Sequence, residues 1–308
     1  MFSKKLLIPL LSLSLLVTPA YSSHAAENAE AAGTSVEGQG MLSPSSSSES
    51  SESVFNGSGA GTSSEPVTDE KLETILKQVQ SQLPAENGTW AVFISDLVNG
   101  TEGSLNDQKM QAASLIKLYI MGAVYENYDQ ITGQYGRDSV DSNLYSMITV
   151  SDNDAANTLT TYLGGGDSAA GMQAVNSFCQ AHGYDQTHMG RMLLASNEND
   201  DNYTSVGDCG HLLQEIYKQD TSSYTHAADM FNLLKAQTRC NKIPAQLPEG
   251  VKTANKTGEL DNVENDAGII YDSKNDVVIV FMSQNLSSAG SAQNTIATLS
   301  RTIYDHYN

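Results

Sequence analysis

The stretch Ser114-Leu115-Ile116-Lys117 places a hydroxyl and an amine one helical turn apart within an otherwise apolar run. Residues at i and i+3 share a helix face, so the Lys117 amine can reach the Ser114 oxygen. The neighbours are apolar on every side of a helix, which predicts burial: Leu115, Ile116, Leu118, Tyr119, Ile120, Met121 and Val124. Burial lowers the pKa of a lysine because the charged form loses its hydration. The stretch therefore predicts a buried helix that carries a serine nucleophile and its base.

The position of Ser114 supports this interpretation. Ala112 and Ala113 precede it and place it near the helix start, where the positive end of the helix dipole favours a developing oxyanion. The alternative is a lysine that extends to solvent from a partly exposed helix, beside an incidental serine. Since S-x-x-K is common by chance, this stretch alone does not decide between the two.

Two further motifs follow in the chain. Ser151-Asp152-Asn153 precedes the helical stretch 154–159, and Lys256-Thr257-Gly258 leads toward the strand-like segment 266–271. Each has a simpler explanation: a helix N-cap for the first, and a surface turn with a solvated lysine for the second. Their residue types are common, so either triplet alone is weak. All three motifs in this order form a specific signal.

With these motifs the chain resembles the serine β-lactamase and penicillin-binding-protein family, most closely the class A enzymes. The segment 147–157 is similar to the class A segment around S-D-N, and 233–258 is similar to the approach to K-T-G. The resemblance covers roughly residues 66–308. It implies an α+β fold, in which an antiparallel sheet built from both termini is flanked by helices and carries an inserted all-α half.

A coarse reading of the pattern predicts the same architecture. Strands at both ends surround a helical block, and a turn at Asn99-Gly100 separates the first two strands. The expected elements are a helix from Thr68, a half-buried strand 90–97, a helical middle 112–235, strands 267–271 and 277–282, and a closing helix with Ile296, Leu299 and Ile303 on one face.

The resemblance also implies roles in catalysis. Ser114 attacks a cyclic or peptide amide and forms an acyl-enzyme, while Lys117 takes its proton directly or through water. Ser151 then relays the proton to the leaving nitrogen. The backbone N–H groups of Ser114 and Glu259 would form the oxyanion hole, in which one donor contributes ~3–4 kcal/mol to transition-state stabilisation.

Substrate binding falls to the remaining motif residues. By resemblance, Asn153 hydrogen-bonds the substrate side-chain amide, and Lys256 and Thr257 hold its carboxylate. Gly258 lets the strand approach closely. Lys117 and Lys256 also lower each other's pKa when clustered, which favours a neutral Lys117.

The chain departs from class A in its Ω-loop. Arg191 fits the arginine of that loop, but Leu193 stands where class A has the glutamate that activates the deacylating water. The nearest carboxylates lie in the segment 197–202, with Glu198 as the candidate replacement base; the alternative is a solvated acidic turn. Without such a base, acylation proceeds while release of the acyl group stalls.

Two other departures concern the cleft. The gap between Lys117 and Ser151 is shorter than class A usually has, which predicts a more open site. Glu259 follows K-T-G, where class A places a small residue. Its carboxylate would repel the carboxylate of a substrate, unless it points away or pairs with Lys256.

The leading hypothesis is a class A-like acyl-serine hydrolase that acts on β-lactam amides. The alternatives are a D-alanyl-D-alanine peptidase or penicillin-binding protein with slow deacylation, which would act on a peptidoglycan stem peptide, a non-catalytic cell-wall or β-lactam sensor, and a promiscuous esterase. Turnover separates the first two, and a covalent adduct separates both from the sensor.

The N-terminal part predicts export. Residues 1–26 have the basic start, apolar run and small residues of a secretory signal, and the apolar run is too short for a comfortable membrane span. Residues 27–66 are rich in Ser, Gly and Glu and contain no Lys or Arg, which predicts a disordered acidic linker. The hydrolase domain spans 67–308. We expect a secreted or extracytoplasmic protein, with association to the cell surface left open.

Composition limits the partners. A formal charge of −20 argues against nucleic acid and anionic membranes. The histidines lack zinc-type spacing, the acidic segment 197–202 lacks the EF-hand pattern, and no phosphate loop is present, so we expect no metal or cofactor. A monomer is expected. Of the cysteines, Cys179 fits a buried small hydrophobe, and any disulfide would join Cys209 and Cys240.

Overall fold

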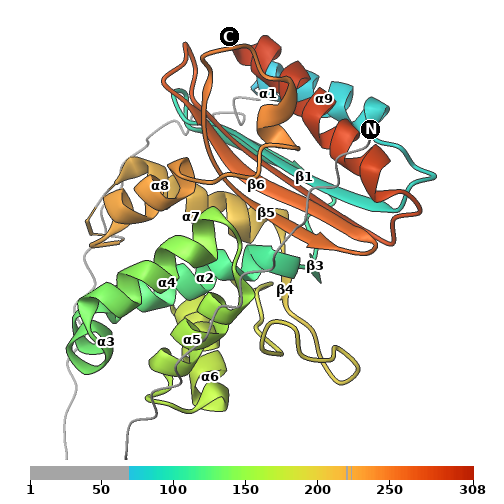
Figure 1. Cartoon of the computed structure of the whole chain (residues 1–308). Helices are drawn as coiled ribbons and strands as arrows, with labels where there is room; N and C mark the ends of the chain where they lie inside the picture. Colours follow the sequence, from blue (N-terminus) through green and yellow to red (C-terminus); the bar gives the residue numbers. More distant parts are fainter. Residues whose placement is uncertain (1–68, 220, 223) are drawn as a thin grey trace, which may run out of the picture. The chain divides into compact units, whose positions relative to one another are not determined.

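Strands from both ends of the described chain form one antiparallel sheet in the order β2-β1-β7-β6-β5 (Figure 1). Their bounds are β1 Thr89–Asp96, β2 Thr101–Leu105, β5 Lys252–Leu260, β6 Val263–Tyr271 and β7 Val277–Gln284. The turn at Asn99-Gly100 joins β1 to β2, as expected. The α+β architecture predicted from the sequence is confirmed.

The computed structural model describes residues 69–219, 221–222 and 224–308. All of these belong to one compact unit. The predicted signal segment 1–26 and linker 27–66 lie outside the described residues. Within the described part, no helix is both long enough and apolar enough to cross a membrane.

Helices cover both faces of the sheet. Trp90, Val92 and Ile94 of β1 pack with α1 (Glu70–Gln82) and α9 (Ala289–Tyr307), whereas Ala91 and Phe93 face the other core. In Figure 1, α1 and α9 lie on one side of the sheet, and α7 (Val206–Lys218) lies on the other. The expectation of a half-buried first strand is therefore wrong, because β1 is covered on both sides.

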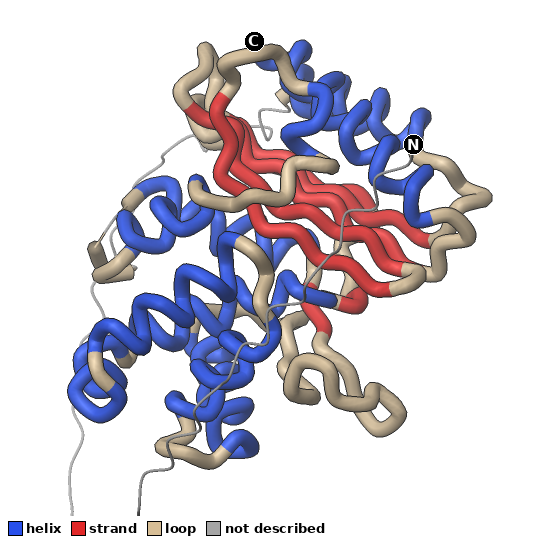
Figure 2. The backbone as a smooth tube through the Cα atoms, in the orientation of Figure 1, coloured by secondary structure: helices blue, strands red, loops and turns tan. Residues whose placement is uncertain are grey.

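The all-α half lies between β2 and β5 in the chain. Figure 2 shows its helices gathered beside the sheet. Its other helices are α2 Ile116–Glu126, α3 Tyr128–Tyr135, α4 Arg137–Thr149, α5 Asn153–Leu163, α6 Ser168–Ala181 and α8 Ala227–Lys235. Every residue from Ile116 to Val124 is buried, which confirms the prediction of a buried helix.

The helical middle is interrupted, contrary to expectation. After α6 the chain runs as a loop to β4 (Tyr203–Thr204), which pairs with β3 (Met110–Gln111) just before Ser114. Glycine, asparagine and aspartate are frequent in this loop, and these residues favour turns over helix. The interruption brings the loop to the start of α2.

The three cysteines are free, so the suggested bridge between Cys209 and Cys240 is wrong. Cys209 is buried in α7, where the Tyr119 hydroxyl donates a hydrogen bond of 3.4 Å to its sulfur. Cys240 is exposed on the loop after α8. Cys179 is buried in α6, as expected for a small apolar residue.

Candidate active site

The three sequence motifs converge at one hollow of about 230 Å³. Its lining consists of Ser114, Ser151, Asn153, Arg239, Thr257 and Glu259, and it is called the motif hollow below. Ser114 lies in the short helix η1 (Ala113–Leu115) that leads into α2. Asp152 caps α5 by accepting a hydrogen bond of 2.7 Å from the Ala155 N–H. Ser151, the residue before this cap, lines the hollow. Lys256 and Thr257 lie within β5 itself rather than before a strand.

The segment before Ser114 is strained and firmly held. Ala113 has φ +46°, in the left-handed region that costs a non-glycine residue ~1–2 kcal/mol. The side-chain amide of Asn265, in β6, donates to the carbonyls of Gln111 and Ala112 at 2.9 and 3.2 Å. The Ala112 N–H donates to the Asn202 carbonyl at 2.8 Å. These bonds fix the position of Ser114 against the sheet.

Lys117 is completely buried, and its amine has three oxygen neighbours. It donates to the Ser151 carbonyl at 2.6 Å, to Ser151 Oγ at 3.1 Å and to Asn153 Oδ1 at 2.7 Å. Desolvation lowers the pKa of Lys117 to about 7; Asp152 opposes this shift and Arg239 adds to it. Among the described residues no hydrogen bond joins Lys117 to Ser114, because Ser151 and Asn153 take up the three donors of the ammonium form.

Ser151 connects the two motif lysines. Lys256 is also completely buried, and its Nζ donates to Ser151 Oγ at 2.9 Å and to the Thr257 carbonyl at 2.7 Å. Desolvation and then the charge of Lys117 hold the pKa of Lys256 well below its usual value. The Ser151 hydroxyl thus lies between two amines that both lose protons easily.

Gly258 brings β5 against Ser114. A Cβ atom at this position would lie 2.9 Å from the Ala112 carbonyl oxygen and 3.2 Å from the Ser114 nitrogen. Only glycine fits such an approach without displacing the backbone. The Ser114 N–H therefore lies beside the part of β5 that continues into Glu259.

Glu259 is held by two cations that the sequence reading did not identify as site residues. Arg239 Nη1 contacts Glu259 Oε2 at 2.9 Å, and Lys242 Nζ contacts Glu259 Oε1 at 3.1 Å. The expected alternative partner, Lys256, does not contact it. Burial raises the pKa of Glu259, but Lys242 and Arg239 outweigh this effect and lower it overall. The sequence signal was a pair of basic residues shortly before K-T-G, in a chain with 36 acidic and 16 basic residues.

A second hollow, of about 250 Å³, shares Ser114, Asn153 and Glu259 with the first. Its lining is Ala113, Ser114, Asn153, Arg191, Leu193, Leu194, Ala195, Glu259 and Leu260, and it is called the loop hollow below. Leu193 is only 8% exposed, and its backbone exchanges two hydrogen bonds with the Asn157 side chain, at 2.9 and 3.0 Å. An apolar side chain is therefore fixed beside Ser114.

Glu198 does not line either hollow and is exposed on the loop. Two neighbouring carboxylates have partners within the loop: Asp200 contacts His188 Nε2 at 2.8 Å, and Asp201 contacts Arg191 Nε at 2.7 Å. The structure thus puts Leu193, rather than Glu198, beside Ser114. The acidic segment serves to fold the loop.

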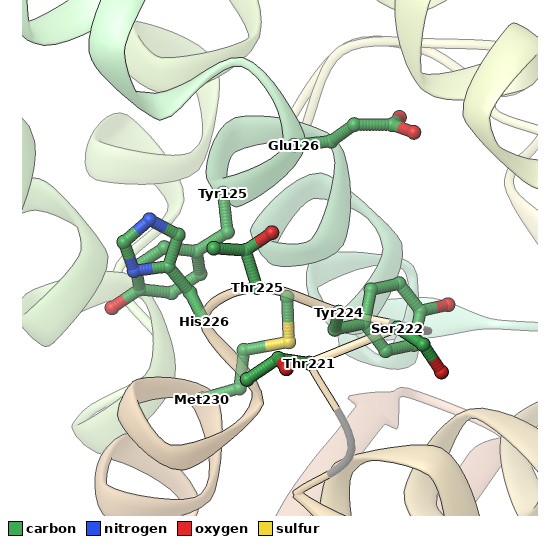
Figure 3. A pocket seen from close by; sticks show the side chains of 8 residues that line it. All are labelled: Tyr125, Glu126, Thr221, Ser222, Tyr224, Thr225, His226 and Met230. Carbon is green, nitrogen blue, oxygen red and sulfur yellow. The ribbon is translucent and has the colours of Figure 1, made fainter.

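A third hollow lies at the far end of α2, near the start of α8 (Figure 3). Tyr125 and His226 stack there with ring centroids 5.1 Å apart, and Met230 lies beneath them. None of the motif residues lines it. Among the described residues, no cluster of His, Cys, Asp or Glu has the arrangement of a metal site.

The chain was compared with known protein families and solved structures. The model of the β-lactamase enzyme family matches residues 71–138 and 134–307. No curated protein matches the chain.

Solved structures with the same fold include a β-lactamase from Sphaerobacter thermophilus DSM 20745, at 22% identity and TM-score 0.64, with 76% of this chain and 96% of that chain covered. A second is PBP-A, at 23% identity and TM-score 0.67, with 76% and 96% covered. A third is the class A β-lactamase of the last common ancestor of Gram-negative bacteria, at 20% identity and TM-score 0.65, with 76% and 100% covered.

Proposed function

Because the chain belongs to the β-lactamase enzyme family, we propose that it is an acyl-serine hydrolase of β-lactam amides, with Ser114 as nucleophile and Lys117 as base. The observation that carries this proposal is the buried chain of Lys117, Ser151 and Lys256, in which one hydroxyl contacts two amines at 3.1 and 2.9 Å. A hydroxyl within hydrogen-bond distance of two amines is placed to pass a proton between them and a bound substrate.

Acylation begins when Lys117 is neutral. A neutral amine has two donors and one lone pair, so one of the three contacts of the ammonium form is released. The lone pair then accepts the Ser114 proton as Ser114 Oγ attacks the carbonyl carbon of the lactam. As the C–N bond breaks, the proton passes from Lys117 through the Ser151 hydroxyl to the leaving nitrogen. The Ser114 and Glu259 N–H groups would stabilise the oxyanion.

Substrate binding uses the walls of the motif hollow. Asn153 supplies an amide for the substrate side chain, although its Oδ1 is shared with Lys117. Thr257 lines the same hollow, and Lys256 is buried next to it in β5; both would hold an anionic group, with Gly258 keeping β5 close to the Ser114 N–H.

A second candidate function, a penicillin-binding protein that releases its acyl group slowly, is favoured by Leu193. Hydrolysis of the acyl-enzyme needs a base that activates water beside Ser114. The loop hollow offers Leu193 at this place, and its one carboxylate, Glu259, is already paired with Arg239 and Lys242. The site thus holds the groups needed to form the acyl-enzyme, but its described lining offers no carboxylate free to activate the water that would hydrolyse it.

A mass-spectrometric time course after mixing with penicillin G tests the proposal. We expect the intact protein to gain the mass of one penicillin at Ser114, and Ser114→Ala to gain none. Disappearance of the adduct within minutes, together with hydrolysis of a chromogenic cephalosporin, identifies a β-lactamase. An adduct that persists for hours identifies the slow-release alternative.

Two outcomes would contradict the proposed hydrolysis of β-lactam amides. If no adduct appears, and wild type and Ser114→Ala bind cell-wall fragments equally, the chain is a non-catalytic sensor. Hydrolysis of p-nitrophenyl esters without any penicillin adduct would identify an esterase. The predicted signal 1–26 supports a further proposal, that the activity lies outside the cytoplasm; its test is fractionation of cells that express the full chain.

A further inference from the structure

Glu259 lies where a substrate would approach the cations of the site. It is two residues after Thr257 on β5, and alternate residues of a strand point to the same side. Both residues line the motif hollow, and Glu259 also lines the loop hollow. Its carboxylate is therefore part of the surface that contacts a substrate bound at Ser114.

The carboxylate of Glu259 is fully engaged. One oxygen contacts Arg239 at 2.9 Å and the other contacts Lys242 at 3.1 Å. Lys242 is completely buried and also contacts Glu264 at 2.6 Å and the Gly258 carbonyl at 3.3 Å. Lys242 is thus confined beneath β5, and Arg239 is the cation that reaches the motif hollow.

The charges of this group cancel. Arg239 and Lys242 are matched by Glu259 and Glu264, so an arriving carboxylate finds no unpaired guanidinium at this wall. To pair with Arg239, it must displace Glu259 and then lie beside that like charge. Juxtaposed like charges disfavour a ligand, and a protein can use them to select between ligands.

We infer that Glu259 is a specificity-determining residue, an internal carboxylate that occupies Arg239 and directs the site toward amides that are uncharged at the position facing Arg239. This inference rests on the proposed acylation of Ser114 and narrows its substrate class. Substrates that carry a carboxylate still bind through Thr257 and Lys256. Glu259 makes their acylation slower than it would be without its negative charge.

The test compares two probes that differ in one charge: benzylpenicillin and its uncharged methyl ester. The measured quantity is the ratio of their acylation rates, followed by intact-protein mass spectrometry. We expect Glu259→Gln to raise the acid-to-ester ratio about tenfold, because Arg239 becomes available to the acid. Glu249→Gln removes one exposed carboxylate outside both hollows, and it should leave the ratio unchanged.

Arg239→Gln gives a second, opposite test that does not depend on Glu259→Gln folding well. It leaves Glu259 paired with Lys242 but removes the guanidinium that lines the motif hollow, so the acid-to-ester ratio should fall. If both variants still acylate and neither ratio moves, the inference is wrong while the proposed function stands. If no protein forms an adduct with either probe, the proposed function itself fails.

Discussion

The two hollows beside Ser114 share Ser114, Asn153 and Glu259 but differ in the rest of their lining. The motif hollow is lined by side chains that carry hydroxyl, amide or charged groups, and two buried amines lie behind it. The loop hollow is lined largely by apolar side chains, with Leu193 held in place by Asn157. The residues that would form the acyl bond are thus present, whereas the one carboxylate that lines the loop hollow, Glu259, is paired with Arg239 and Lys242.

The largest expected effect is on the polar side. Lys117→Met should slow acylation by about a thousandfold, because a positioned general base contributes roughly 10²–10⁴ in rate. The rate of labelling with fluorescent penicillin measures this effect. Lys252→Met, at the exposed start of β5, is the matched control and should label at the wild-type rate. Equal labelling of both variants would remove Lys117 from the mechanism.

On the apolar side, Leu193→Glu should accelerate release of the acyl group by about a hundredfold, since it puts a carboxylate beside Ser114 and Arg191. The measurement is the decay of the penicillin adduct by mass spectrometry. Glu198→Gln should leave that decay unchanged. Slower decay of the adduct in Glu198→Gln would instead identify Glu198 as the base for release of the acyl group.

The pH dependence of acylation sharpens the comparison without mutation. The neutral form of Lys117 is the base, and its pKa of about 7 means that this form is lost as the pH falls. Labelling should therefore decrease about tenfold for each pH unit below 7 and reach a plateau above it. Rates measured from pH 5 to 9 give the profile. A rate that is flat from pH 5 to 7 contradicts a lysine base.

The smallest effect is expected at Gly258, which lies in β5 between Thr257 and Glu259. Gly258→Ala adds a methyl group 2.9 Å from the Ala112 carbonyl, so η1 and β5 must move apart. We expect about a fivefold slower acylation and a loss of ~1–3 kcal/mol in the free energy of unfolding. Labelling rates and urea unfolding measure the two. An unchanged acylation rate would show that this contact does not position Ser114.

Much of this architecture was readable from the sequence, because local patterns determine it. The apolar run around Lys117 is buried on all sides in the structure, and the apolar segments of β6, β7 and α9 lie where the pattern puts them. The motif residues come together because η1, the start of α5 and the edge strand β5 meet at the motif hollow. Local chemistry and position in the fold agree at these places.

Other features depend on contacts between distant segments. β5 has a polar sequence without a strand pattern, and it is buried because β6, η1 and α8 surround it. Asn265, Arg239 and Lys242 form no motif; their roles follow from a carbonyl, a carboxylate and a strand that lie far away in the chain. A sequence shows such residues as ordinary polar side chains.

The exposed thiol of Cys240 has a practical consequence, because Cys240 directly follows Arg239 while Cys179 and Cys209 are buried. A maleimide dye added to the folded protein should attach at that one place, next to Arg239 in the chain. The natural chain thus carries its own attachment point for an optical reporter. Stopped-flow fluorescence would then follow the Arg239 loop when a penicillin is added.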